Sequence, residues 1–207
     1  MKTTVVDHPL AAEQLTVLRD ETTDRATFRR AVDNLAAMLI YEATRYLAVE
    51  TTSVRTPLGP AEGVRLPRLP VVVPVLRAGL GMADAAFRLL PEAEMSFVGL
   101  ARDEETFEPH PYMAKLPARL EGRPVIVLDP MLATGGSLEF TCRLIAERGA
   151  GRMTVVCVLA APEGLKRMEA TGFDLHIVTA AIDDHLNEHA YIVPGLGDAG
   201  DRLFGLG

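Results

Sequence analysis

The sequence predicts an α/β fold in which a parallel sheet is flanked by helices, with N-terminal helices and an extended β-arm before it. Apolar runs of strand length recur after residue 70 without polar alternation, so both faces of these strands should be buried. Helical patterns stand between several of the runs, as crossovers between parallel strands require. Residues 56–70 hold four prolines and two glycines and cannot be helical, so they predict the arm.

The elements follow in order along the chain. Two helical patterns come first, at residues 9–20 and 24–48, and Asp24 stands where an N-cap is expected. The expected strands are residues 71–76, 95–100, 124–128, 153–160 and 174–180. The expected helices between them are residues 81–90, 137–148 and 163–170, and a polar insertion covers residues 102–119.

Length and composition favour a single domain. The 207 residues are 48% hydrophobic and 24% charged, as in ordinary globular domains. We divide them into helices (1–50), arm (51–70), α/β core (71–180) and a C-terminal segment (181–207). The net charge of −7 repels nucleic acid backbones, so we expect no nucleic acid partner.

Cysteine usage and hydropathy suggest a compartment. Cys142 and Cys157 stand in apolar stretches without partners at ligand spacing, which predicts buried, reduced thiols. A leader pattern and an apolar run of membrane-spanning length are both lacking. We therefore expect a cytoplasmic protein with no membrane partner.

Ligands of open parallel sheets bind where strands end and loops to the next helices begin. Four loops there carry polar or glycine-rich sequence, at residues 77–81, 102–115, 129–137 and 191–201. The insertion of residues 102–119 is long for an α/β connection and rich in acids and prolines, which is typical of a lid.

Residues 125–137 predict an anion site. A buried strand ends at Asp129, and a small turn then enters a helix. Gly135 and Gly136 permit positive φ, so backbone N–H groups can converge on a phosphate, with Thr134 and Ser137 adding hydroxyl donors. No lysine follows the glycines, which argues against a P-loop ATPase. The plainer alternative is a Gly-Gly turn with Ser137 as an ordinary N-cap.

Other motifs have competing interpretations. Gly79 and Gly81 follow a buried strand, as in a dinucleotide-binding oxidoreductase, but Asp84 stands where the third glycine should be. That interpretation also leaves the loop at residues 129–137 without a role.

His185 and His189 could share a helical face, but a solvated pair is favoured over a metal site. Tyr191 could stack on a ligand or pack in the core.

The segment Asp129-Pro-Met-Leu-Ala-Thr-Gly-Gly-Ser137 is similar to the signature with which type I phosphoribosyltransferases bind phosphoribosyl pyrophosphate (PRPP). Pro130 after the acid resembles the uracil phosphoribosyltransferases in particular. Residues 71–82 resemble the family's pyrophosphate loop, residues 102–106 its flexible loop and residues 191–202 its uracil-binding stretch. His8-Pro9-Leu10 and residues 41–44 also match, so the likeness is essentially full length. The end, Phe204-Gly-Leu-Gly207, departs from the common Phe-Gly-Thr.

The resemblance implies a type I phosphoribosyltransferase-like sheet and a glycosyltransferase that converts uracil and PRPP to UMP and diphosphate in pyrimidine salvage. The implied catalytic residues are Arg77, Arg102 and Asp198. The implied PRPP-binding residues are Arg77, Arg102, Asp129, Pro130, Met131, Leu132, Ala133, Thr134, Gly135, Gly136, Ser137 and Asp198. The implied uracil contacts are Ile192, Gly197, Asp198 and Ala199, within a uracil-binding hood at residues 181–207. Mg²⁺ should arrive with PRPP and have no direct protein ligand.

Partners and regulation are further expectations. The arm at residues 51–69 resembles an oligomer contact of the family, which favours a homodimer or a larger homo-oligomer. GTP activates some relatives, so GTP binding and allosteric activation are expected, although the residues identify no effector site. The alternative function is a regulatory protein of the same fold that binds PRPP or a nucleotide. Its RNA-binding form is disfavoured by the acidic charge.

Overall fold

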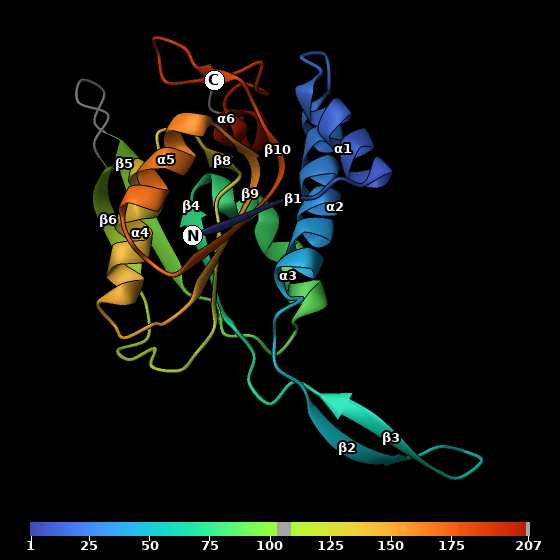
Figure 1. The fold of residues 1–207 in the computed structure, drawn as a ribbon. Coiled ribbons are helices and arrows are strands. Elements are labelled where there is room, and N and C mark those ends of the chain that lie inside the picture. The colour runs from blue at the N-terminus through green and yellow to red at the C-terminus, as the bar shows by residue number, and fades with distance from the viewer. Residues whose placement is uncertain (103–108, 206–207) are drawn as a thin grey trace.

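The computed structural model describes residues 1–102 and 109–205 and shows helices packed on both faces of a central sheet (Figure 1). The helices are α1 (Pro9–Arg19), α2 (Arg25–Ala43), α3 (Ala83–Leu89), α4 (Gly136–Ala146), α5 (Pro162–Ala170) and α6 (Ala199–Phe204), with a 3₁₀ helix η1 (Ala78–Met82) before α3. The main-sheet strands are β1 (Lys2–Val5), β4 (Val71–Leu76), β5 (Phe97–Arg102), β6 (Pro109–Lys115), β7 (Val125–Leu128), β8 (Met131–Leu132), β9 (Met153–Ala160) and β10 (Leu175–Ile182). Two separate hairpins are formed by β2 (Glu50–Arg55) with β3 (Pro60–Arg65), and by β11 (His185–Leu186) with β12 (Ile192–Val193).

The strand order of the main sheet is β1-β10-β9-β7-β4-β5-β6, and β8 also pairs with β9. All neighbours run parallel except β5 and β6, which are antiparallel. The carboxyl ends of β4 and β7 are adjacent because these two strands pair in register, Val73 opposite Val127. The loops that follow them therefore meet at one edge of the sheet. The predicted α/β fold class is confirmed.

Each face of the sheet has its own apolar core. Along β4, Val72 faces the layer of α1, α2 and α3, whereas Val71 and Val73 face the layer of α4 and α5. Side chains of a strand alternate between faces, so a run of apolar residues serves both cores. Phe28 and Leu35 are examples of fully buried α2 side chains that face this sheet. Burial on both faces explains the unbroken apolar strands.

Some elements differ from the sequence prediction. Residues 2–5 form an edge strand where none was expected, because Lys-Thr-Thr-Val has no apolar run and gains its structure by pairing with β10. Residues 109–115 were expected in a polar insertion, but they form β6 against β5. The helix expected at 81–90 is η1 followed by α3, and α2 ends at Ala43 instead of about residue 48.

The β2–β3 hairpin forms the arm and projects away from the core (Figure 1). Its apolar side chains are exposed: Leu58 is 100% exposed and Val64 is 65% exposed. Arg65 forms an ion pair with Glu50 across the hairpin at 3.0 Å. An isolated two-stranded hairpin is only marginally stable in water, so the arm needs support from outside its own strands.

Several local predictions hold. Asp24 caps α2, its Oδ1 accepting the N–H of Thr27 at 3.0 Å. Cys142 and Cys157 are buried free thiols, and burial raises the pKa of each to about 12. Within residues 1–102 and 109–205, no helix has the length and apolar character needed to cross a membrane.

Candidate active site

An open pocket of about 650 Å³ lies at the carboxyl ends of β4 and β7 and is closed on one side by residues 189–201. Three of the four loops singled out from the sequence contribute to it. Its lining residues are Val75, Leu76, Arg77, Ala78, Leu100, Asp129, Met131, Ala133, Ser137, His189, Ala190, Tyr191, Ile192, Gly197, Asp198, Ala199, Gly200 and Asp201. A pocket at this edge of a parallel sheet is the position expected for a ligand.

Arg77 brings a positive charge to the pocket directly after β4. The Leu76–Arg77 peptide bond is cis, and η1 begins at the next residue. The Arg77 side chain is 53% exposed, and its Nη2 lies 3.9 Å from Oδ1 of Asp201, which is 43% exposed. A pair this open is weak in water, so the guanidinium remains available to an anionic ligand.

Asp129 stands at the end of β7, as predicted, and is 9% exposed. Its own N–H donates to the carbonyl of Val156 at 3.1 Å, which fixes the residue beside β9. Its Oδ1 accepts the N–H of Met131 at 3.4 Å. The backbone of Asp129 is therefore tied to β9 and its carboxylate to the start of β8, while the residue lines the pocket.

The turn after Asp129 leads the amino end of α4 into the pocket. Gly135 is the N-cap with φ of 81°, so the predicted positive φ is confirmed there. Gly136 is already helical, so the cap lies two residues before Ser137, and Ser137 is not an ordinary N-cap. Ser137 lines the pocket from the first turn of the helix. Free N–H groups at a helix start attract phosphate, in agreement with an anion site.

The other predicted residues of this turn support its shape. The pocket lining does not include Pro130, Leu132, Thr134, Gly135 or Gly136. Pro130 and Leu132 are buried, and their carbonyls accept hydrogen bonds from β9 residues and from Ala161, respectively. The Arg102 side chain and residues 103–108, which are part of the expected lid, lie outside the described residues.

The pocket wall formed by residues 189–201 includes all four predicted uracil contacts, Ile192, Gly197, Asp198 and Ala199. Asp198 also caps α6, its Oδ1 accepting the N–H of Asp201 at 2.8 Å. That cap fixes one oxygen and leaves the exposed side chain facing the pocket.

Some pocket residues were missed or left undecided by sequence reasoning. Asp201 was not predicted as a site residue, although it ends the loop singled out at residues 191–201. Tyr191 is 46% exposed and lines the pocket, so it is not a core residue. His185 belongs to β11 and His189 to a loop, so the two do not share a helical face. Among the described residues, no group of three or more His, Cys, Asp and Glu side chains is placed to hold a metal ion.

Known proteins share this chain's sequence and architecture. The family model described as "Uracil phosphoribosyltransferase" matches residues 5–206. A uracil phosphoribosyltransferase of Corynebacterium efficiens is 56% identical over 205 residues, which cover 99% of this chain and 97% of the relative. A solved structure of an Aquifex aeolicus protein has a TM-score of 0.93 at 40% identity and covers 99% of this chain and 98% of its own. A hypoxanthine phosphoribosyltransferase of Staphylococcus aureus, 16% identical with a TM-score of 0.51 over 76% of both chains, shares the fold.

The parallel sheet flanked by helices, with an acid and a glycine turn at the end of β7, has the fold of the type I phosphoribosyltransferases. Within that class, the chain belongs to the uracil phosphoribosyltransferase family. It is accordingly a pentosyltransferase, and the fold and family predicted from the sequence are confirmed.

Proposed function

We propose that this protein transfers the phosphoribosyl group of PRPP to uracil, giving UMP and diphosphate for pyrimidine salvage. The observation that carries the proposal is the composition of one pocket. A helix amino end, an arginine and a loop with exposed backbone groups surround the same space at the sheet edge. PRPP needs two anion subsites separated by a sugar, and uracil needs a flat polar subsite beside them.

The phosphate loop supports the placement of the ribose 5-phosphate. Its phosphate would take the N–H groups at the start of α4, together with Ser137 and the backbone of residues 133–136. Asp129 would accept hydrogen bonds from the ribose hydroxyls, since an ionised carboxylate is a strong acceptor. Arg77 and Arg102 would hold the diphosphate with planar donor forks.

Uracil would lie against residues 191–199. Its carbonyl acceptors and N–H donors match backbone amides and carbonyls, which a loop exposes and a regular strand or helix does not. Gly197 lies in such a loop, whereas Ile192 belongs to the two-residue strand β12 and Ala199 is the first residue of α6, where a helix leaves its N–H without an intrahelical partner. Asp198 lies beside them and would contact PRPP or orient the base near the reacting carbon.

In the reaction the bond from the anomeric carbon to diphosphate breaks, and a bond to uracil N1 forms as N1 loses its proton. Charge grows on diphosphate, so Arg77 would stabilise the transition state electrostatically. The described residues place no carboxylate cluster around a metal ion, so a Mg²⁺ ion would be held mainly by PRPP oxygens and water, and Asp129 at the pocket wall would accept hydrogen bonds from that water. Such an ion would neutralise diphosphate charge.

The test mixes purified protein with Mg²⁺, PRPP and labelled uracil, with cytosine, hypoxanthine, adenine and orotate in parallel. We expect UMP and equimolar diphosphate from uracil alone, and a large loss of turnover in Asp198→Asn. If PRPP binds but no base reacts, the catalytic proposal is wrong and the regulatory alternative is favoured.

We further propose that the protein acts in the cytoplasm as a homodimer or larger homo-oligomer and that GTP activates it. The exposed apolar residues of the arm support the oligomer. Repeating the uracil assay with and without GTP tests the activation, and an unchanged rate at saturating and limiting PRPP would contradict it.

A further inference from the structure

A buried ion pair joins the end of α1 to the end of β10. The guanidinium of Arg19 contacts both carboxylate oxygens of Asp183, with Nη1 to Oδ2 at 2.8 Å and Nη2 to Oδ1 at 2.5 Å. The Asp183 side chain is 4% exposed and that of Arg19 is 27% exposed. Neither residue lines the pocket.

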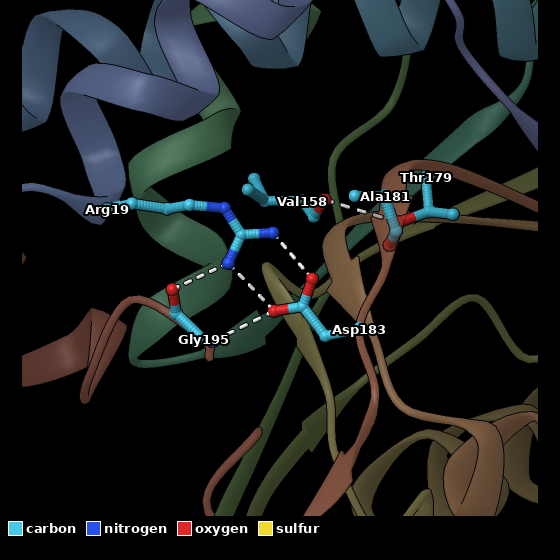
Figure 2. A network of polar contacts seen from close by, with 6 residues as sticks. All are labelled: Arg19, Val158, Thr179, Ala181, Asp183 and Gly195. Atoms are coloured by element: carbon cyan, nitrogen blue, oxygen red, sulfur yellow. Dashed lines mark hydrogen bonds and ion pairs between the residues drawn. The ribbon is translucent and has the colours of Figure 1, made fainter. Parts of the chain in front are cut away.

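Gly195 completes this network from the base side of the pocket. Its N–H donates to Asp183 Oδ2 at 2.8 Å, and its carbonyl accepts from Arg19 Nη1 at 2.8 Å (Figure 2). The backbone N–H and the carbonyl of Gly195 are thus both hydrogen-bonded to the same ion pair. The pair therefore fixes the position and the orientation of Gly195.

Gly195 in turn constrains Ile192. The φ of Gly195 is 65°, and a Cβ there would lie 2.1 Å from the carbonyl oxygen of Ile192. The two residues are thus packed backbone to backbone. Ile192 also pairs with Leu186 in the β11–β12 hairpin that begins just after Asp183. A shift of Gly195 would consequently shift Ile192, which lines the pocket.

A second arginine, Arg202, also links the same loop to the end of α1. Arg202 of α6 donates to the carbonyls of Leu18 and Leu196, the latter at 2.8 Å, and to that of Asp20 at 2.7 Å. The end of α1 is therefore attached to the loop at Gly195 and at Leu196. Ile192, Leu196 and Ala199 also belong to the apolar core shared with α1 and α2, and the ion pair adds a directional polar link to this packing.

We propose that Arg19 and Asp183 are positioning residues for the uracil subsite, holding Gly195 and Ile192 so that the pocket presents its backbone groups in the geometry that binds the base. The inference rests on the proposed function, because it assigns the loop at residues 191–199 to uracil. It places a determinant of base binding in α1, outside the pocket. The phosphate subsites at Asp129 and α4 share none of these contacts, so the pair should affect uracil and leave PRPP nearly unaffected.

The experiment compares Arg19→Ala, Arg19→Lys and Asp183→Asn with the wild type, varying uracil and PRPP separately. We expect the uracil KM of Arg19→Ala to rise about tenfold to hundredfold, because small displacements of binding groups have effects of that order. The Kd for PRPP should change by less than about twofold, since its subsites lie elsewhere. Arg19→Lys keeps the charge without the fork and should recover part of the loss. Arg88→Ala is the control, because Arg88 forms a more exposed ion pair with Asp33 at 2.7 Å between α3 and α2 and, within the described part of the chain, makes no hydrogen bond or ion pair with residues 184–200.

Hydrogen exchange of peptides covering residues 184–200 provides a readout that does not need turnover. Exchange should be faster in Arg19→Ala and Asp183→Asn than in the wild type and in Arg88→Ala. Unchanged exchange, or equal rises in uracil KM and PRPP Kd, would overturn the inference. If the wild type makes no UMP, the proposed function fails, and the exchange data still decide whether the pair holds the loop. If Arg19→Ala does not fold, Arg19→Lys and Asp183→Asn carry the test.

Discussion

Arg77 and Arg19 show how burial separates the roles of two similar side chains. Arg77 is half exposed, and its ion pair with Asp201 is long, at 3.9 Å. Arg19 is largely buried and forms a short, two-point pair with Asp183. The first arrangement leaves donors free for a ligand, and the second uses its donors to hold the chain.

We predict that Arg77→Ala raises the KM for PRPP about tenfold to hundredfold, because hydrogen bonds to a charged group contribute about 1.5–3 kcal/mol. Arg77→Lys should recover part of this affinity as a point charge. Steady-state kinetics at saturating uracil measure the effect, with Arg123→Ala, whose partner is Glu94 at 2.8 Å, as a control. Unaltered PRPP kinetics in Arg77→Ala would exclude Arg77 from the diphosphate subsite.

The Arg19–Asp183 pair also predicts a pH dependence of stability. Burial opposes ionisation of Asp183, but hydrogen bonds from Arg19 and the Gly195 N–H outweigh it and hold the pKa of Asp183 below its usual 3.8. The contribution is therefore fully present above that usual value and is lost as pH falls through the lower pKa of the folded state. Asp183→Asn should lower the free energy of unfolding by about 3 kcal/mol at neutral pH.

Urea unfolding of both proteins from about pH 7 to about pH 2 tests this. The difference between Asp183→Asn and the wild type should shrink at the acid end. A difference that stays constant or grows toward low pH would contradict the assigned ionisation.

At the scale of elements, α2 shows how a helix with clear periodicity is anchored. Leu35 is fully buried between α2 and the sheet, whereas Tyr41 of the same helix is 68% exposed. We predict that Leu35→Ala lowers the free energy of unfolding by about 3 kcal/mol because it leaves a cavity. Tyr41→Ala should change it by less than about 0.5 kcal/mol. Equal effects of the two substitutions in urea unfolding would refute this account of α2.

The elements predicted well are those whose pattern is local. Strands such as β9 read as unbroken apolar runs because both of their faces are covered, and α2 carries helical spacing and an N-cap. β1 escaped prediction because its structure depends on β10, a partner distant in sequence. β6 escaped because Pro109 and Pro111 hide its strand pattern, and it gains its structure by pairing with the preceding strand, β5. Sequence patterns predict a strand only where its own residues carry the signal.

The residues of the site also divide into those that a local motif predicts and those that it does not. Asp129 and Gly135 were found because strand, acid and glycine turn are adjacent in the chain. Asp183 and Arg19 carry no motif, and their meeting requires the whole sheet to form, so residue patterns could not reveal them. The Arg102 side chain and residues 103–108 lie outside the described part of the chain, and their roles stay predictions.

At the scale of the whole molecule, the β2–β3 arm is a separate two-stranded sheet that projects away from the core of its own chain. We predict that replacing residues 51–64 by a short Gly-Ser linker lowers the mass measured by light scattering to that of one chain. The oligomer would lose a contact, but the core should still fold, because the arm is a separate sheet that projects from it.

A point variant sharpens the same test. Leu58→Ser at the arm tip should weaken association, because Leu58 is 100% exposed within the chain and needs a partner to be covered. Leu10→Ser is the control, since Leu10 on α1 is 54% exposed and distant from the arm in sequence. A wild type with the mass of a single chain would refute the proposed oligomer.

β1 has a further consequence for how the molecule is made. Lys2 pairs with His176, so β1 can take its place in the sheet only after β10, far later in the chain, has been synthesised. Until β10 emerges, β1 has no neighbour in the sheet, and β9 presents an open edge to other chains. Nascent chains should therefore depend on chaperone protection until late in translation, and an N-terminal tag would sit at the strand that completes the sheet.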